Sequence, residues 1–248
     1  MVLKDGGKMS KSVGNVVSPE EIVGKYGADT ARLFILFAAP PEKDLEWSDQ
    51  GVEGSYRFLK RVWNIVGKYE DIQTEEKGKL SSDEFALRRK LHQTIKKVTE
   101  DLDGKFAFNT AISAIMELVN DMYRFIEAHD TIEASLSGEL VRNLLILLAP
   151  FVPHMTEELW QSAGQKEESI HLAAWPACDE SALVVDEVEL AVQVNGKVRA
   201  TISVPVAMAR EEIGEKAQAL PEIQKFTEGK TIVKVIVVPK RIVNIVVK

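Results

Sequence analysis

The stretch EFALRRKLHQTIKKVTED, residues 84–101, decides the fold class of most of the chain. Its apolar residues recur every three or four positions, and this spacing places them on one face of an α-helix. Ser81 and Glu84 stand three positions apart at its start, which is the pattern of a capping box, and Gly104 follows its end. The predicted apolar face consists of Leu87, Leu91, Ile95 and Val98.

Similar helical patterns lie on both sides of this stretch. Ser18, Pro19 and Glu21 predict a helix start with a second capping box. A helix is also expected over Thr30–Phe37, which Pro40 and Pro41 end. Long amphipathic helices joined by short loops, with no strands between them, are typical of a helical bundle. Four further helices are predicted. One carries the apolar stripe Tyr56, Leu59, Val62, Trp63 and Val66, and another begins near Asn109. The other two span Gly138–Leu148 and Pro153–Trp160.

The pattern changes to strict alternation in residues 187–248. Residues 188–194 and 197–204 alternate apolar and polar side chains around Asn195-Gly196, the dipeptide that favours a tight hairpin turn. Val198, Ala200, Ile202 and Val204 are predicted to face inward. Two short helices, 209–218 and 221–227, then precede two more strands, 231–238 and 242–247. The fold class is therefore mainly α, with a small α+β terminal domain of order β-β-α-α-β-β.

Composition and charge narrow the function classes. The chain has 248 residues, a net charge of −7 and one cysteine, Cys178, so an intrachain disulfide or a cysteine-cluster zinc site is excluded. No apolar run is long enough to span a bilayer, so we expect a cytoplasmic protein that contacts no membrane. So acidic a chain is not a general nucleic-acid or DNA binder. However, residues 187–248 carry ten basic and seven acidic residues, or +3, which leaves −10 on residues 1–186 and places a boundary near 186.

The loop expected over residues 1–15 contains the pattern that carries chemistry. Lys8-Met9-Ser10-Lys11-Ser12 places two lysines three positions apart among small residues, so both ammonium groups can reach one polyanion. Ser10 and Ser12 add hydroxyl donors. Such a loop suits the leaving pyrophosphate of a nucleotidyl transfer, because charge develops on the phosphate oxygens. The pattern lacks the glycines of a Walker A loop.

These residues resemble the signature loop of class I aminoacyl-tRNA synthetases, and the flanking residues resemble the leucyl-tRNA synthetases of the bacterial type. The isoleucyl and valyl enzymes share the loop and the Tyr-Gly-Ala-Asp stretch, but they lack the run from Ala-Pro-Pro-Glu to Glu-Trp-Ser. The resemblance covers essentially the whole chain. It rests on Gly14–Val17, Tyr26–Thr30, Arg32–Phe34, Ala39–Glu42, Leu45–Asp49, Val192–Lys197, Ile236–Pro239 and Val243–Val246.

The resemblance implies a different role for each segment of the chain. Residues 1–48 would form the signature loop and a stem-contact segment, with Lys11 on the ATP phosphates, assisted by Lys8, and Met9, Ser10 and Ser12 completing the loop. Residues 49–164 would be a helical-bundle tRNA domain of the anticodon-binding type, 165–186 a linker, and 187–248 a terminal tRNA-binding domain. ATP is the expected nucleotide, with Mg²⁺ in the complete enzyme. No tightly bound cofactor and no protein metal site are expected in this chain.

The expected partners are leucine tRNA and, through the catalytic half, leucine and ATP. Backbone and stacking contacts suit recognition of RNA shape. For Arg57, Lys60 and Arg61, a solvated helix face is the alternative to RNA contact. The predicted RNA-binding residues are Arg57, Lys60, Arg61, Lys197, Arg199, Lys234, Lys240 and Arg241.

The chain departs from the resemblance in one large respect. None of His92, His129, His154 or His171 fits the His-x-Gly-His motif of the nucleotide-binding half, and no Rossmann-type sheet or editing domain is expected. The chain is therefore interpreted as a C-terminal fragment that does not form leucyl-adenylate alone. Three alternatives stay open: a free-standing tRNA-binding module, a subunit of a split synthetase, and another class I synthetase with a similar loop.

Overall fold

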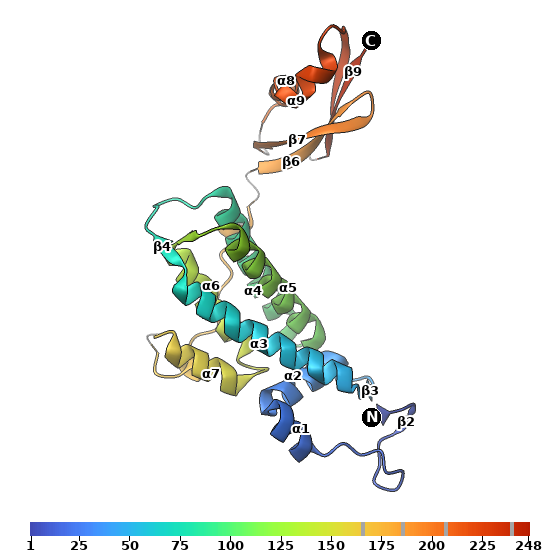
Figure 1. Ribbon diagram of the computed structural model, residues 1–248, viewed down its shortest axis with the longest axis vertical. Coiled ribbons are helices and arrows are strands. Elements are labelled where there is room, and N and C mark those ends of the chain that lie inside the picture. The colour runs from blue at the N-terminus through green and yellow to red at the C-terminus, as the bar shows by residue number, and fades with distance from the viewer. Residues whose placement is uncertain (165–166, 185–186, 206–207, 239–240) are drawn as a thin grey trace. The chain divides into compact units, whose positions relative to one another are not determined.

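The computed structural model describes residues 1–164, 167–184, 187–205, 208–238 and 241–248. The chain forms two compact units, Met1–Leu183 and Val184–Lys248. The first is mainly helical and the second combines a sheet with two helices (Figure 1). The predicted fold class is confirmed. Within the described residues, no helix is both long and apolar enough to cross a membrane.

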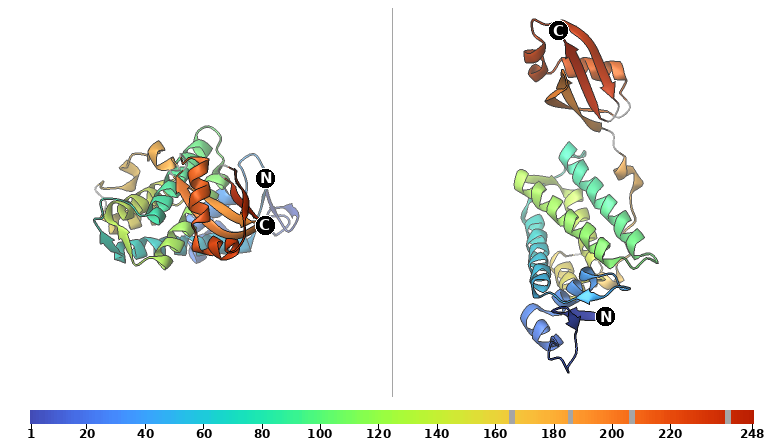
Figure 2. Two further views of the ribbon diagram at one scale, coloured as in Figure 1. Left: turned by 90° about the horizontal axis from the view of Figure 1, so that it is seen from above. Right: turned by 90° about the vertical axis from the view of Figure 1, so that its right-hand side faces the viewer.

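A bundle of helices makes up most of the first unit. Helices α4 and α5 lie side by side, and α3 and α6 pack against them (Figures 1 and 2). The capping box at the start of α4 is present, and all four predicted apolar residues of this helix are buried. The helices are α3 (Asp49–Asp71), α4 (Ser82–Leu102), α5 (Phe108–Ala128), α6 (Ala134–Leu148) and α7 (Pro153–Ser162).

Two details of the bundle differ from the sequence prediction. Trp63 was expected on the buried stripe of α3, but it is 46% exposed, because Val62, Ile65 and Val66 already fill the core side of this turn. Strands were not expected between the helices. Nevertheless, β4 (Gln73–Glu75) pairs in parallel with β5 (Thr131–Glu133). These strands are too short for an alternating pattern to show.

The segment after α7 packs against the bundle as a strap, residues 167–183. It contains two short 3₁₀ turns, Ile170–Leu172 and Glu180–Leu183. Ile170 is buried in the bundle core, and the Asp179 carboxylate binds the Arg88 guanidinium of α4 at 2.9 Å. Hydrogen bonds from Ser181 and this arginine hold the pKa of Asp179 at about 2. The strap is therefore fastened by both apolar burial and charge.

The N-terminal module, residues 1–48, is more ordered than a loop. Strand β1 (Val2–Lys4) pairs antiparallel with β2 (Gly7–Lys8) and parallel with β3 (Leu45–Glu46). The prediction of an irregular loop over residues 1–15 is therefore wrong for β1 and β2, because β1 also pairs with β3, which lies some forty residues away in the sequence. Helices α1 (Pro19–Tyr26) and α2 (Ala28–Ala38) follow.

The start of α1 also differs from its prediction. Ser18 is the N-cap residue and Pro19 the first helical residue, as expected. However, the Ser18 side chain accepts no capping hydrogen bond, and its hydroxyl instead donates to the Glu20 carboxylate at 3.1 Å. The predicted capping box with Glu21 is therefore wrong, because the neighbouring carboxylate takes the hydroxyl.

The second unit has the predicted order β-β-α-α-β-β. Helices α8 and α9 pack on the sheet, whose strand order is β7-β6-β9-β8. Asn195 and Gly196 have φ angles of 49° and 79°, as the predicted hairpin turn requires. Val198 was expected to face inward, but it is 59% exposed, because a register shift at Val192/Gln193 changes the pairing near the turn. The elements are β6 (Glu187–Val194), β7 (Lys197–Pro205), α8 (Arg210–Gln218), α9 (Pro221–Thr227), β8 (Ile232–Val238) and β9 (Ile242–Val247).

Candidate functional site

The signature loop, residues 8–12, leaves β2 and turns back toward β1. Asn15 fixes this turn: its side-chain oxygen accepts from the Ser10 backbone N–H at 2.8 Å. The Asn15 amide also donates to the Lys4 and Lys8 carbonyl oxygens at 3.4 and 3.3 Å. Gly14, with φ of 75°, closes the turn by donating its N–H to the Ser10 carbonyl at 3.2 Å. One asparagine side chain thus joins three segments of the loop.

The loop presents its polar groups to solvent. Lys8 and Lys11 are exposed, and among the described residues neither forms an ion pair with a carboxylate. The Ser10 and Ser12 hydroxyl oxygens lie 3.1 Å apart and share a hydrogen bond. Unneutralised ammonium groups beside hydroxyl donors can bind a phosphate chain. The same groups do not fit Mg²⁺, which prefers carboxylate and carbonyl oxygens.

Two sets of polar contacts attach the N-terminal module to the bundle. Asp29 of α2 is 8% exposed, and its carboxylate accepts from the Met155 backbone N–H at 2.7 Å and lies 2.8 Å from His154 Nδ1. Arg32 donates to the backbone carbonyls of Pro150 and Phe151. The Asp29 carboxylate caps the start of α7, and Arg32 binds the turn between α6 and α7. Together these contacts fix the module that carries the loop on the helical bundle.

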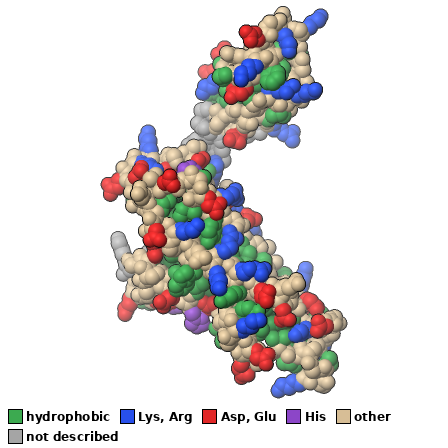
Figure 3. Space-filling model, in the orientation of Figure 1, with side chains coloured by type: hydrophobic (Ala, Val, Ile, Leu, Met, Phe, Trp, Pro, Cys, Tyr) green, Lys and Arg blue, Asp and Glu red, His purple; other side chains and the backbone are tan. Residues whose placement is uncertain are grey.

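The basic residues predicted on α3 differ in how they are held. Lys60 Nζ lies 4.7 Å from the centre of the Tyr56 ring. Arg61 lies 4.8 Å from the centre of the Tyr123 ring and donates to Asn120 Oδ1 at 2.8 Å. Arg57 is exposed. On the face of the bundle that includes α3, Lys and Arg side chains stand next to hydrophobic ones (Figure 3).

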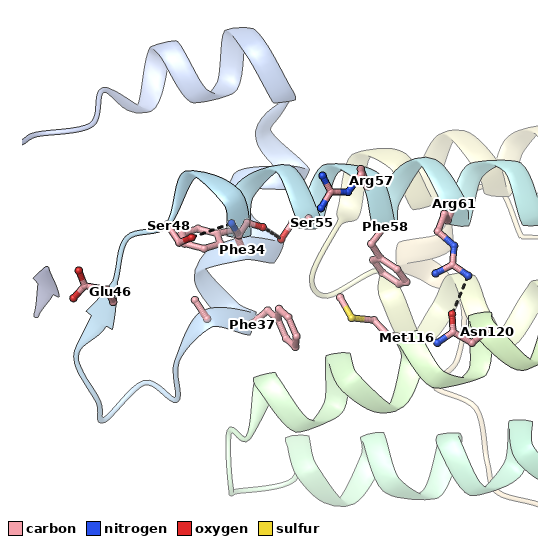
Figure 4. A pocket seen from close by; sticks show the side chains of 13 residues that line it. Phe34, Phe37, Glu46, Ser48, Ser55, Arg57, Phe58, Arg61, Met116 and Asn120 are labelled. Carbon is pink, nitrogen blue, oxygen red and sulfur yellow. Dashed lines mark hydrogen bonds between the residues drawn. The ribbon is translucent and has the colours of Figure 1, made fainter. Parts of the chain in front are cut away.

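Arg57 and Arg61 border a cavity, here named the α3 pocket. Its volume is about 670 Å³, and it opens between α2, α3, α5 and β3 (Figure 4). Its apolar and aromatic groups come from three helices, and its polar groups stand around them. The lining residues are Phe34, Phe37, Ala38, Glu46, Ser48, Gly51, Gly54, Ser55, Arg57, Phe58, Arg61, Met116 and Asn120.

The structure does not gather the predicted basic residues of the second unit into one cluster. Lys197 and Arg199 lie on β7 and Lys234 lies on β8, the two opposite edges of the sheet. The Arg199 guanidinium lies 4.2 Å from the centre of the Phe226 ring. Arg241 stands before β9, at the far end of the sheet from the Asn195 turn. Lys240 lies outside the described residues.

Sequence reasoning missed several residues of these sites. No structural role was predicted for Asn15, although an asparagine after glycine in a short loop is a signal for a side-chain-stabilised turn. Asp29 and Asn120 contact residues far away in the sequence, and no local pattern reveals such contacts. Among the described residues, no three His, Cys, Asp or Glu side chains are placed to hold a metal ion.

Residues 84–213 match the family described as the anticodon-binding domain of tRNA ligase, and residues 1–48 match the class I tRNA synthetases for isoleucine, leucine, methionine and valine. The first match covers more than half of the chain. The chain belongs to the anticodon-binding domain family of tRNA ligases. The two matches lie on either side of α3, so the loop module and the bundle each resemble the same class of enzyme.

Individual relatives make the resemblance more specific. The whole chain is 51% identical to 30% of a leucine–tRNA ligase of Thioalkalivibrio sulfidiphilus (strain HL-EbGR7). It also superposes, with a TM-score of 0.68 and 34% identity, on 32% of the ligase in a LeuRS–tRNA–LeuAMS complex of Agrobacterium radiobacter K84. The predicted resemblance to leucyl-tRNA synthetases is confirmed. The chain spans about a third of the length of these relatives.

A more distant structure supports the fold alone. The methionyl-tRNA synthetase of Mycobacterium tuberculosis, in complex with methionyl-adenylate, matches 66% of the chain and 37% of its own length. Its TM-score is 0.54 and its sequence identity 23%. The fold of about two thirds of the chain is therefore shared beyond the two leucine–tRNA ligases.

Proposed function

We propose that this chain is the C-terminal part of a leucine–tRNA ligase, which joins leucine to its tRNA and converts ATP to AMP and pyrophosphate. The observation that carries the proposal is the exposed pair Lys8 and Lys11 on a loop fixed by Asn15, in a chain that aligns along its whole length with a leucine–tRNA ligase. Leucine is the substrate of that relative by name, and the wider family uses ATP.

The loop would act on the first half-reaction. The leucine carboxylate attacks the α-phosphorus of ATP, the bond to the bridging oxygen breaks, and pyrophosphate leaves with the electron pair. Lys11 would neutralise charge that develops on the leaving phosphates, and Lys8 would assist, with Met9, Ser10 and Ser12 shaping the loop. Any Mg²⁺ used in the reaction would be held by other groups, because this loop offers no carboxylate.

The remaining surfaces would hold leucine tRNA. We propose residues 49–164 and 187–248 as its two binding domains, with Arg57, Lys60 and Arg61 in the first and Lys197, Arg199, Lys234, Lys240 and Arg241 in the second. Those of these cations that the structure describes, Lys197, Arg199, Lys234 and Arg241, lie on both edges and one end of a small sheet. A spread of this kind suits phosphate contacts along a folded RNA better than the reading of a few bases. We place the enzyme in the cytoplasm, where tRNA is charged.

Filter binding tests the RNA part of this proposal. The chain should bind leucine tRNA more tightly than a tRNA for another amino acid, and its affinity should fall as salt rises, because phosphate contacts release counterions. In addition, the isolated chain should not catalyse leucine-dependent pyrophosphate exchange. Exchange at a normal rate, or equal affinity for both tRNAs, would contradict the proposal.

A further inference from the structure

We infer that the α3 pocket accepts a single unstacked nucleobase of the bound tRNA. This inference deepens the proposed function and rests on it, since it names the part of the RNA that one surface of the bundle would take. The cavity has a volume of about 670 Å³, which is in the range of sites that enclose small organic groups.

The floor of the pocket suits a flat aromatic ring. Phe37 of α2, Phe58 of α3 and Met116 of α5 converge there (Figure 4). Phe58 is buried and Phe37 half-buried, so the Phe37 ring has surface left to cover. Nucleobases stack on such rings, and methionine sulfur also packs favourably against aromatic faces.

The rim suits the polar parts of a nucleotide. The Arg61 guanidinium is held in place by Asn120 and Tyr123, so little side-chain freedom is lost when it meets a phosphate. The Asn120 amide group can donate to a base edge. The Glu46 carboxylate of β3 also lines the pocket and can accept from an exocyclic amino group.

Charge decides between an RNA and an apolar peptide as the occupant. Arg57 and Arg61 stand one helical turn apart beside the pocket, and Lys60 lies between them in sequence. Among the described residues, Arg57 forms no ion pair. Two arginines at the mouth of an aromatic cavity complement a phosphate and its attached base, whereas an apolar side chain would leave both charges unused.

Two glycines of α3 allow a direct test of the proposed base site. Gly54 lies in the second turn of this helix and lines the pocket, and an added Cβ would meet only Arg57 Nη2, at 3.9 Å. Gly67 lies on the same helix, has no atom within 4 Å of its added Cβ, and does not line the pocket. Leucine at either position should favour the helix, but only Gly54→Leu would occupy the space for the base.

The experiment measures two properties of the 248-residue chain with leucine tRNA. Filter binding gives the affinity, and dimethyl sulfate probing shows which base edges the protein protects. Gly54→Leu should weaken binding roughly tenfold and remove the protection of one base, since the loss of one stacked base has about this effect. Gly67→Leu should change neither property, and both variants should unfold at or above the wild-type temperature.

Further results distinguish an error in the pocket inference from an error in the proposed leucine specificity. Affinity and protection unchanged in Gly54→Leu would overturn the inference, as would unchanged binding by Arg57→Gln, an exposed substitution that should not affect folding. If the unaltered chain bound leucine tRNA and another tRNA equally, while Gly54→Leu still removed one protected base, the pocket would stand and the proposed leucine specificity would be wrong.

Discussion

The start of α4 and the signature loop use charged side chains in opposite ways. Glu84 is 1% exposed, and its carboxylate accepts from the Ser81 N–H at 2.7 Å, from the Glu133 N–H at 2.8 Å and from Lys77 Nζ at 3.0 Å. Lys8 and Lys11 are exposed and pair with no described carboxylate. The start of α4 therefore satisfies its buried charge internally, while the ammonium groups of the loop stay exposed to solvent.

This difference separates residues that hold the fold from residues that we propose to act on a substrate. A change at Glu84 should alter stability and leave the loop unaffected. A change in the loop should alter chemistry and leave stability unaffected. If a change at Glu84 altered the loop, or a change in the loop altered stability, the two regions would be less independent than their contacts indicate.

Glu84→Gln should produce the largest loss of stability. Removing the charge leaves the buried hydrogen-bond donors poorly matched, and we expect a loss of about 2 to 3 kcal/mol in the free energy of unfolding at pH 7. Chemical denaturation measures it. Glu100→Gln, an exposed change on the same helix, is the matched control and should have almost no effect.

The pH dependence of stability gives an independent check on the same carboxylate. Burial acts to raise the pKa of Glu84, but the hydrogen bonds from Ser81, Lys77 and Glu133 outweigh it and hold the pKa at about 2, below the ordinary 4.5. A lowered pKa stabilises the fold above the unfolded value, and this stabilisation is lost as pH falls from about 4.5 through 2. Wild type should therefore lose stability over this interval, and Glu84→Gln should lose less. Parallel curves for the two proteins would contradict the assignment.

Asn15→Ala should have an intermediate effect, confined to the loop. Loss of the hydrogen bonds to Ser10, Lys4 and Lys8 should loosen the loop and speed tryptic cleavage after Lys8 and Lys11, by roughly tenfold. The unfolding free energy of the bundle should change by less than about 0.5 kcal/mol. Cleavage at the wild-type rate would mean that Asn15 does not order the loop.

Replacing Lys197 and Arg199 by Glu should have the smallest effect, a several-fold weaker affinity for leucine tRNA. The difference should shrink at high salt, because it arises from phosphate contacts. Lys216 and Lys225, on α8 and α9, provide a control pair with the same change in charge. Equal weakening by the control pair would indicate a general charge effect rather than a contact surface on β7.

The sequence predicted those parts of the fold that local patterns determine. The stripe of α4, its capping box and the Asn195-Gly196 turn were confirmed, since each depends on residues close together in the chain. The parallel pairing of β1 with β3 was missed, because it joins Val2 to Leu45.

The signature loop and the α3 pocket differ in the same respect, because only the loop depends on residues that are close together in the sequence. The loop could be predicted because Lys8–Ser12 is continuous in sequence. The α3 pocket could not, because α2, α3 and α5 must pack before Phe37, Phe58 and Met116 meet. The exposed side of Trp63 likewise depends on which neighbours fill the core first.

We propose that the ammonium groups of Lys8 and Lys11 stabilise the departing pyrophosphate. The most direct test replaces both by Ala in a complete leucine–tRNA ligase that contains this chain and measures leucine-dependent pyrophosphate exchange. We expect a rate lower by roughly a hundredfold or more, with a modest change in leucine affinity. An unchanged rate would contradict this proposal.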